Sequence, residues 1–236
     1  MYHSVKRHER ERFARQMDHL VRVARPVYAD FDGVQAADGS RYVAVTFDDA
    51  YQSVLENALP ILQQRSIPGT FFVPTKYLGS RPGWITNERH RNAGERLLTM
   101  DELRDVQKSG GLIGSHGVSH RSLTELSGAE AFAELTESRQ VLQEILGQKV
   151  GMFALPYGSS NPDVLRMAAR AGYERVFLGV PLRSSGNIEE HVVGRIDVSP
   201  TDWPLEYRLK VRGAYQWLPL AIAAKRRIVA VLRQFF

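Results

Sequence analysis

The sequence contains no cysteine. This absence excludes disulfide bonds and every thiolate metal site, and it leaves the redox compartment open. Any bound metal must therefore be held by histidine, aspartate or glutamate, a ligand set that suits hard or borderline divalent ions.

Long apolar runs are also absent. No stretch approaches the roughly 20 apolar residues that a membrane-spanning helix needs. The chain turns charged soon after Met1-Tyr2-His3, with no apolar run before a cleavage site, so the sequence predicts no signal peptide. We therefore expect a cytoplasmic or peripheral membrane-associated protein.

Charge is distributed unevenly along the chain. Residues 1–28 carry seven Lys/Arg and three acidic residues, residues 203–236 carry seven and one, and residues 29–202 carry 17 and 22. The basic ends are compatible with a membrane surface, with nucleic acid, or with solvated helix faces. Because no nucleic-acid-binding motif accompanies them, we expect no nucleic-acid partner.

Strand and helix patterns alternate along the chain. Apolar and β-branched runs predict strands at 42–47, 70–73, 112–114, 150–155, 175–178 and 192–198. Helical spacing and capping residues predict helices at 9–24, 54–62, 99–110, 127–146 and 161–171. This alternation predicts an α/β fold: a distorted or incomplete (β/α) barrel of about six to seven parallel strands wrapped by helices.

Three groups of polar residues directly follow predicted strands. They are Asp48-Asp49, His116 to His120, and Pro156-Tyr157-Gly158. Reactive groups of such barrels lie at the carboxyl ends of the strands. We therefore expect the three groups to meet at one site.

Two adjacent carboxylates at the end of a buried strand repel each other unless a cation is present. We infer that one of Asp48 and Asp49 binds a metal and that the other stays free as a base. Both can face one site only if the chain turns there. The alternative interpretation is that one of them caps the helix that begins near Gln52.

His116 and His120 are four residues apart, a spacing that places two imidazoles on one helical face or turn. One aspartate and two histidines give three protein ligands with open positions, as in catalytic zinc sites. Alone, such a pair is more commonly explained as two surface histidines.

These motifs resemble the polysaccharide deacetylases, which form carbohydrate esterase family four and contain the NodB-homology domain. The resemblance rests on Thr46-Phe47-Asp48-Asp49, Ser115-His116-Gly117-Val118-Ser119-His120 and Phe153-Ala154-Leu155-Pro156-Tyr157-Gly158, and covers about residues 40–180. The last motif is similar to the circularly permuted poly-N-acetylglucosamine deacetylase branch.

The resemblance implies a role for each motif. Asp48 would be the general base, and Asp49, His116 and His120 would hold the metal, with zinc first and cobalt, nickel or manganese as alternatives. Pro156 and Tyr157 would contact substrate, and the Tyr157 N–H would help to form an oxyanion hole. The implied reaction is hydrolysis of the acetamide of an N-acetylated sugar, in a polysaccharide or a lipid-linked saccharide, with release of acetate.

The sequence departs from the family pattern at several positions. Ala50 replaces a usual glycine, Gly117 replaces a hydroxyl residue, and Ala154 replaces an arginine that orients the base. We expect Arg195, on the last predicted strand, to supply the missing cation and contact substrate. Gly117, Ala154 and the unassigned catalytic acid motivate the alternative function, an inactive carbohydrate-binding or scaffold protein that keeps the fold.

The catalytic acid has two candidates. The permuted branch carries its acid in an N-terminal Tyr-His pair, which Tyr2-His3 resembles; the alternatives are a floppy terminal histidine and His191 as acid. The strand that would anchor Tyr2-His3 is missing, so we expect a truncated or naturally short chain.

Residues 1–202 are predicted to form the polysaccharide deacetylase domain. Residues 203–236 are predicted to be a basic amphipathic helical extension, packed on the barrel or in peripheral contact with a membrane. Trp203 and Trp217 within it are expected in the core.

Overall fold

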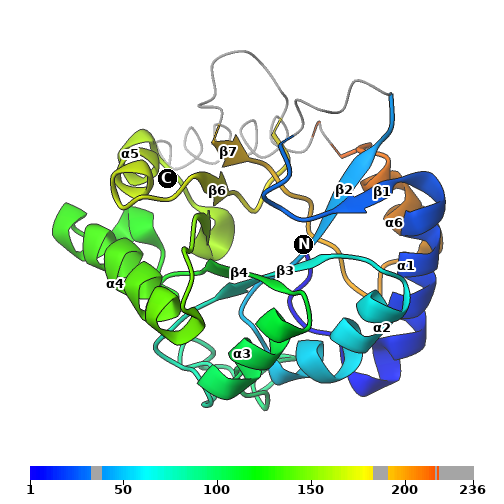
Figure 1. Cartoon of the computed structure of the whole chain (residues 1–236), viewed down its shortest axis with the longest axis horizontal. Coiled ribbons are helices and arrows are strands. Elements are labelled where there is room, and N and C mark those ends of the chain that lie inside the picture. Colours follow the sequence, from blue (N-terminus) through cyan, green and yellow to red (C-terminus); the bar gives the residue numbers. More distant parts are fainter. Residues whose placement is uncertain (33–38, 183–190, 216, 218–236) are drawn as a thin grey trace, which may run out of the picture.

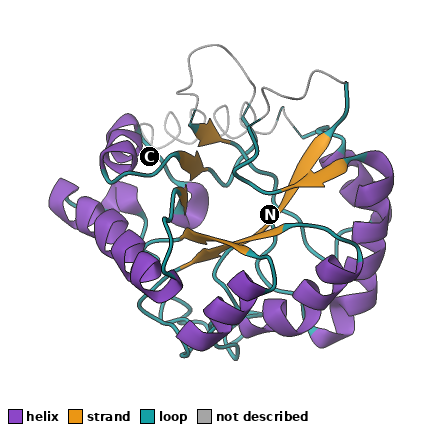
Figure 2. Cartoon of the chain, in the orientation of Figure 1, coloured by secondary structure: helices purple, strands orange, loops and turns teal. Residues whose placement is uncertain are grey.

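The computed structural model describes residues 1–32, 39–182, 191–215 and 217 (Figure 1). Its centre is one sheet of seven parallel strands that pair in sequence order. The strands are β1 (Arg25–Val27), β2 (Tyr42–Phe47), β3 (Gly69–Val73), β4 (Leu112–Ser115), β5 (Met152–Ala154), β6 (Arg175–Phe177) and β7 (Val192–Val193). The sheet curls and helices surround it (Figure 2), which confirms the predicted distorted α/β barrel.

The helices lie where the sequence predicts them. They are α1 (Arg10–Val23), α2 (Leu59–Gln64), α3 (Met100–Lys108), α4 (Gly128–Leu146), α5 (Pro162–Arg170) and α6 (Pro204–Val211), with short turns η1 (Arg7–Glu9), η3 (Val54–Ala58), η4 (Leu123–Glu125) and η5 (Pro156–Gly158). Local capping sets their bounds. Thr99 accepts a hydrogen bond from the Glu102 N–H at the start of α3, and Gly147 ends α4 with φ of 65°.

Two strands differ from the prediction. The short strand β1 was missed because its three residues include Pro26 and show no alternation. The last strand, predicted over 192–198, ends at Val193. Beyond it the N–H of Arg195 donates to the Val180 carbonyl, and the N–H of Val198 donates to the Met1 carbonyl. The chain therefore leaves the β6 ladder early.

The first two residues lie beside the carboxyl end of β2. The Tyr2 N–H donates to the Thr46 carbonyl at 2.7 Å, and the Asp48 N–H donates to the Tyr2 carbonyl at 2.9 Å. On the other side, Met1 accepts the Val198 hydrogen bond. The segment thus fills the space between β2 and the chain after β7. The backbone of Tyr2 is therefore anchored by β2 itself, through the bridge to Phe47.

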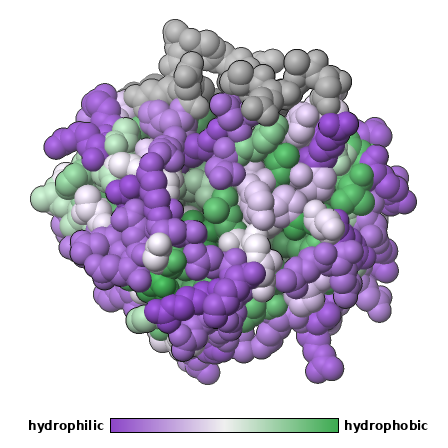
Figure 3. All heavy atoms as spheres, viewed as in Figure 1, coloured by the Kyte–Doolittle hydropathy of each residue, from purple (hydrophilic) through white to green (hydrophobic). Residues whose placement is uncertain are grey.

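Aromatic packing holds this arrangement in the core. The Phe47 ring stacks on Phe71 at 5.1 Å and on Tyr2 at 5.7 Å, and Phe13 of α1 meets the Tyr2 ring edge-on at 5.2 Å. All four side chains are buried. On the face shown in Figure 3, hydrophilic residues cover much of the rim, and hydrophobic residues are visible between them.

The described part of the C-terminal extension packs on the barrel through α6. Tyr207 is buried, and its ring lies 6.1 Å from that of His19 on α1. The expectation that the tryptophans lie in the core is wrong: Trp203 is 78% exposed and Trp217 is 56% exposed. Trp203 precedes α6, whose inward position is taken by Tyr207. Residues 218–236, with the predicted membrane-facing helix, lie outside the described residues.

Among the described residues, no helix is both long and apolar enough to cross a bilayer.

We predict that Phe47→Ala lowers the free energy of unfolding by about 3–5 kcal/mol, because it removes a buried ring and leaves a cavity among its neighbours. Denaturant titration measures this change. Met100→Ala, at a side chain 52% exposed on α3, is the control and is expected to change stability by less than about 0.5 kcal/mol. Equal effects of the two substitutions would contradict the proposed role of the aromatic cluster.

Candidate active site

A cavity of about 680 Å³ opens at the carboxyl ends of the strands. The segments that follow β2, β4 and β5 supply the residues that the sequence analysis singled out. The N-terminal residues, the loop 79–96 and residues 197–200 complete its wall. The lining includes His3, Asp48, Asp49, His116, His120 and Tyr157. The three predicted motifs therefore meet at one site.

A left-handed turn directs the two aspartates into this cavity. Asp49 has φ of 69° and Ala50 has φ of 53°, a region that non-glycine residues rarely occupy. This turn lets two neighbouring carboxylates serve one site, where an extended strand would send them to opposite faces. Ala50 thus stands where glycine would be less strained. Neither carboxylate caps the following helix: Glu95 accepts the Ser53 N–H there, so the capping interpretation is wrong.

Asp49, His116 and His120 form a buried cluster whose ligand atoms all lie within 4.8 Å of one another. Oδ1 of Asp49 is 3.1 Å from Nε2 of His120 and 3.6 Å from Nε2 of His116. This buried oxygen has no hydrogen-bond partner among the described residues. A buried carboxylate oxygen without a donor, facing two imidazole nitrogens, fits a divalent cation of the zinc type.

His116 is held in the tautomer that metal binding requires. Its Nδ1 lies 2.7 Å from the Ala154 carbonyl and donates to it, which leaves the Nε2 lone pair facing Asp49. Burial lowers the pKa of His116 to about 4, so the ring is neutral near pH 7. Ala154 thus contributes its backbone to the site.

The loop that joins the two histidines is braced by Glu134 of α4. Its carboxylate accepts hydrogen bonds from the N–H groups of Val118 at 2.7 Å and Ser119 at 2.9 Å, and from the Ser119 hydroxyl. A Cβ at Gly117, where φ is 81°, would lie 3.1 Å from the same carboxylate. Glu134 therefore supplies the bracing that the sequence lacks at Gly117.

Arg195 binds Asp48 through both carboxylate oxygens. The two contacts measure 2.6 and 2.8 Å, and both side chains are buried. The guanidinium also lies over the Phe72 and Phe177 rings, 5.1 and 5.7 Å from their centroids. Burial alone would raise the pKa of Asp48, but the charge of Arg195 outweighs it and holds that pKa well below the usual range. Asp48 is therefore ionised, and Arg195, from the segment after β7, supplies the cation that Ala154 on β5 does not.

The two candidate acids lie at different edges of the sheet. His3 lines the catalytic cavity, and its Nδ1 is 3.7 Å from Oδ1 of Asp197. His191 directly precedes β7, and its carbonyl accepts from the N–H of Val176 on β6, which places His191 at the amino end of these strands. The structure therefore brings His3, and not His191, to the same cavity as Asp48.

Aromatic side chains enclose His120 on two sides. The Trp84 ring stacks on the imidazole at 4.2 Å with 19° between the planes, and the Tyr157 ring meets it edge-on at 4.8 Å. Tyr157 itself has φ of 58° and is 64% exposed, so its ring forms part of the open rim.

The loop 79–96 is tied to the N-terminal segment that carries His3. Ser4 donates to Asn92, Arg91 contacts the buried carboxylate of Glu9, and Lys6 pairs with Glu95. These contacts hold one wall of the cavity against the residues beside His3.

Sequence reasoning missed Trp84 and Glu134. Trp84 lies in a polar loop with no periodicity to place it. Glu134 did leave a signal, because it lies between Ala131 and Leu135 on the buried face of α4, where an acidic residue needs a partner.

Comparison with known proteins fits this geometry. Residues 35–176 match the family model for polysaccharide deacetylase, which is more than half of the chain. The chain belongs to the polysaccharide deacetylase family. The metal-site motifs all lie within the matched residues.

Individual relatives share modest identity. The chain is 27% identical over 168 residues to the poly-beta-1,6-N-acetyl-D-glucosamine N-deacetylase of Staphylococcus aureus (strain MRSA252), covering 67% of this chain and 55% of that protein. The chain spans about half the length of the curated relatives it matches.

Solved structures agree on the fold. IcaB from Ammonifex degensii aligns with a TM-score of 0.69 and 27% identity, covering 86% of this chain and 89% of that one. The Streptococcus pyogenes deacetylase PplD aligns with a TM-score of 0.71 and 19% identity, covering 89% and 94%. The family and its poly-N-acetylglucosamine branch are thus those that the motifs resemble.

We predict that zinc stabilises the chain through this cluster. At about 1,000 times its dissociation constant, a ligand bound only by the folded state contributes about 4 kcal/mol. For a chain of this size that raises Tm by roughly 10 °C in a thermal-shift measurement. His120→Ala should abolish the shift, and His8→Ala, at an exposed histidine of η1, should retain it. An unchanged shift in His120→Ala would place the metal elsewhere.

Proposed function

We propose that the chain is a metal-dependent carbohydrate N-deacetylase that hydrolyses the acetamide of N-acetylated sugars and releases acetate. The observation that carries the proposal is the buried Asp49–His116–His120 cluster beside the Asp48–Arg195 ion pair in one cavity. The substrate would be a polysaccharide or a lipid-linked saccharide. A Staphylococcus aureus relative named as a poly-N-acetylglucosamine deacetylase supports the substrate class.

Asp49, His116 and His120 would hold a divalent metal, with zinc first and cobalt, nickel or manganese as alternatives. When bound, such an ion polarises a carbonyl and makes water acidic enough to attack near neutral pH. One carboxylate and two imidazoles, with the His116 ring neutral, match that requirement.

Asp48 is placed to act as general base, because it is ionised and lines the cavity beside the metal ligands. It would take a proton from the attacking water. Arg195 orients its carboxylate through two hydrogen bonds. Pro156 and Tyr157 would contact the substrate, and the Tyr157 N–H would stabilise the oxyanion that develops on the acetamide oxygen.

His3 would act as general acid and protonate the departing amine. Its position in the cavity supports this role, since Tyr2 fixes the backbone beside β2 and Asp197 lies within 3.7 Å. The general acid and base would thus come from neighbouring segments at the same strand end.

Two of the three features that support the alternative, an inactive carbohydrate-binding or scaffold protein, are offset by other side chains. Glu134 braces the loop at Gly117, and Arg195 replaces the cation missing at Ala154. Residues 1–202 would form the catalytic domain and residues 203–236 an extension, and this division is supported by the position of every group named above before residue 203.

We predict that Asp48→Asn lowers kcat by about 10²–10⁴-fold on an N-acetylglucosamine oligomer, because the general base is lost. Acetate release measures this change. Asp101→Asn, at a carboxylate 89% exposed on α3, is the matched control and should retain activity. Full activity of Asp48→Asn would show that Asp48 is not the general base.

The pH profile tests Arg195 separately. Without the guanidinium, burial raises the pKa of Asp48, so in Arg195→Met the acid limb of kcat/KM should move to higher pH. Arg195→Lys keeps a cation and should move the limb less. An acid limb that does not move in Arg195→Met would show that Arg195 does not set the charge of the base.

The acid is tested by a matched histidine pair. His3→Gln should lower kcat by about 10²–10⁴-fold, and His191→Gln should leave it near the starting value, because only the former enters the cavity. The reverse result would assign the acid to His191. Metal-induced stabilisation should persist in both variants.

A further inference from the structure

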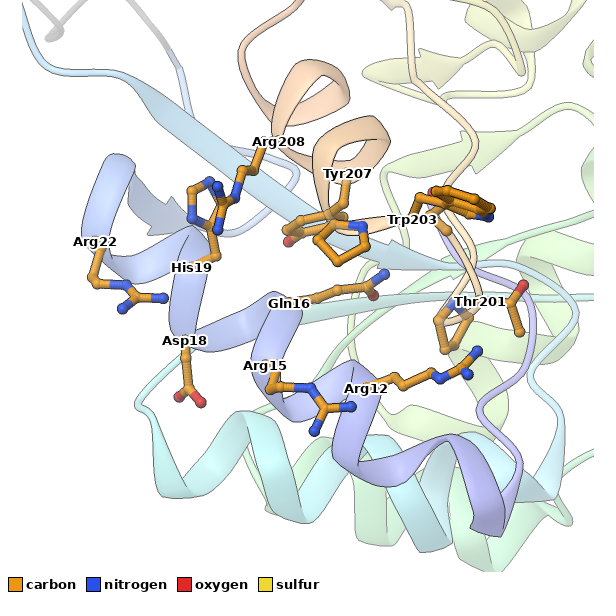
Figure 4. Close-up of a pocket in the computed structure, with 13 residues that line it drawn as sticks. Arg12, Arg15, Gln16, Asp18, His19, Arg22, Thr201, Trp203, Tyr207 and Arg208 are labelled. Atoms are coloured by element: carbon orange, nitrogen blue, oxygen red, sulfur yellow. The ribbon is translucent and has the colours of Figure 1, made fainter.

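A second cavity, of about 760 Å³, lies between α1 and the start of α6 (Figure 4). Its floor is formed by Gln16 and Tyr207, which are both buried. Four arginines line it: Arg12, Arg15, Arg22 and Arg208. The first three form one stripe along α1, at helical spacing. The cavity is therefore basic, and none of the proposed catalytic groups lies in it.

The positive charge of this cavity is largely uncompensated. The side chains of Arg12, Arg22 and Arg208 make no hydrogen bond or ion pair with the described residues. The two acidic lining residues are already engaged, since Asp18 pairs with Arg65 at 2.7 Å and Asp202 pairs with Lys210 at 2.7 Å.

A neighbouring histidine responds to this charge. Burial lowers the pKa of His19, and the charges of Arg208 and Arg22 lower it further. The cavity therefore presents a positive potential with room for anions.

Beside the cavity, α6 exposes apolar side chains, of which only Trp203 lines the cavity itself. Leu205 and Leu209 of α6 are 67% and 39% exposed, and Trp203 at the start of the helix is 78% exposed. The leucines are four residues apart and share one outward face with Arg208. Exposed leucine and tryptophan beside arginine are typical of helices that lie in a lipid interface.

We propose that this face, formed by α1 and α6, docks on the anionic surface of a lipid membrane. The arginines around the cavity would bind lipid phosphates, and Trp203, Leu205 and Leu209 would enter the interface. Charge complementarity identifies the occupant as anionic, and the exposed leucines favour lipid over nucleic acid, whose phosphate backbone gives them nothing to bury against.

The proposed docking face lies beside the catalytic cavity. Pro200 lines both this cavity and the catalytic cavity. Gln16, which lines the second cavity, also connects the two cavities. It accepts from the Tyr2 hydroxyl at 2.9 Å and donates to the carbonyl of Ser199, which lines the catalytic cavity, at 2.8 Å. A membrane bound at α1 and α6 would therefore lie next to the opening that His3 lines.

Vesicle sedimentation of the full chain tests the proposal. We expect binding to vesicles of phosphatidylcholine with phosphatidylglycerol, weaker binding at high salt, and little binding to phosphatidylcholine alone. The triple variant Arg12→Gln, Arg22→Gln, Arg208→Gln should bind roughly 100-fold more weakly, at about fivefold per arginine. All three side chains are exposed, so the fold should persist, as the Tm will check.

A matched control removes the same charge elsewhere. Arg121→Gln, Arg166→Gln and Arg170→Gln together change exposed arginines on the side of α4 and α5, which lies across the molecule from α1 and α6 in Figure 1. This control should retain binding. Equal losses of vesicle binding in the two triple variants would show that only the net charge of the chain matters, which would overturn the proposal.

The exposed apolar side chains of α6 are tested by Leu205→Ser with Leu209→Ser. This pair should weaken vesicle binding and leave binding to duplex DNA, measured in parallel, unchanged. Duplex binding that exceeds vesicle binding, or no vesicle binding at all, would overturn the proposal. Equal binding to vesicles with and without phosphatidylglycerol would do so as well.

Discussion

The buried ion pair between Arg195 and Asp48 joins the segment that follows β2 to the segment that follows β7. Asp48 follows β2, Arg195 follows β7, and neither strand pairs with the other among the described residues. Two buried charges are costly to desolvate, and two-point hydrogen bonding offsets that cost. The pair therefore links closure of the fold to the charge of the proposed base.

The N-terminal residues occupy the same gap. Tyr2 pairs its backbone with β2, Met1 contacts the chain after β7, and the Tyr2 ring packs between Phe13 and Phe47. The same N-terminal residues therefore take part in core packing, in backbone pairing with β2 and in the wall of the site. Strain is concentrated there too, since Asp49, Ala50, His120 and Tyr157 all have positive φ. Such strain persists only where surrounding contacts hold it.

At two positions where the chain lacks the usual family residue, another side chain makes a contact in its place. Glu134 binds the loop that lacks a hydroxyl at Gly117, and Arg195 binds Asp48, the proposed base, where Ala154 supplies no cation. The Ala154 carbonyl still orients His116. The side chains and backbone groups that surround the site thus come from different strands and helices. The α1 and α6 face adds a second charged surface whose wall the catalytic cavity shares at Pro200.

The strands, the helices and the members of the buried Asp49–His116–His120 cluster were predictable from the sequence, because apolar periodicity, capping residues and motif order are local properties. Thr99 and Gly147 set helix ends within a few residues of themselves. Tertiary structure alone decided the rest. That His3 reaches the cavity while His191 does not, and that Trp203 is exposed while Tyr207 is buried, depends on which segments pair across the fold. Such contacts join residues more than 100 positions apart, as Arg195 and Asp48 do, and no local pattern encodes them.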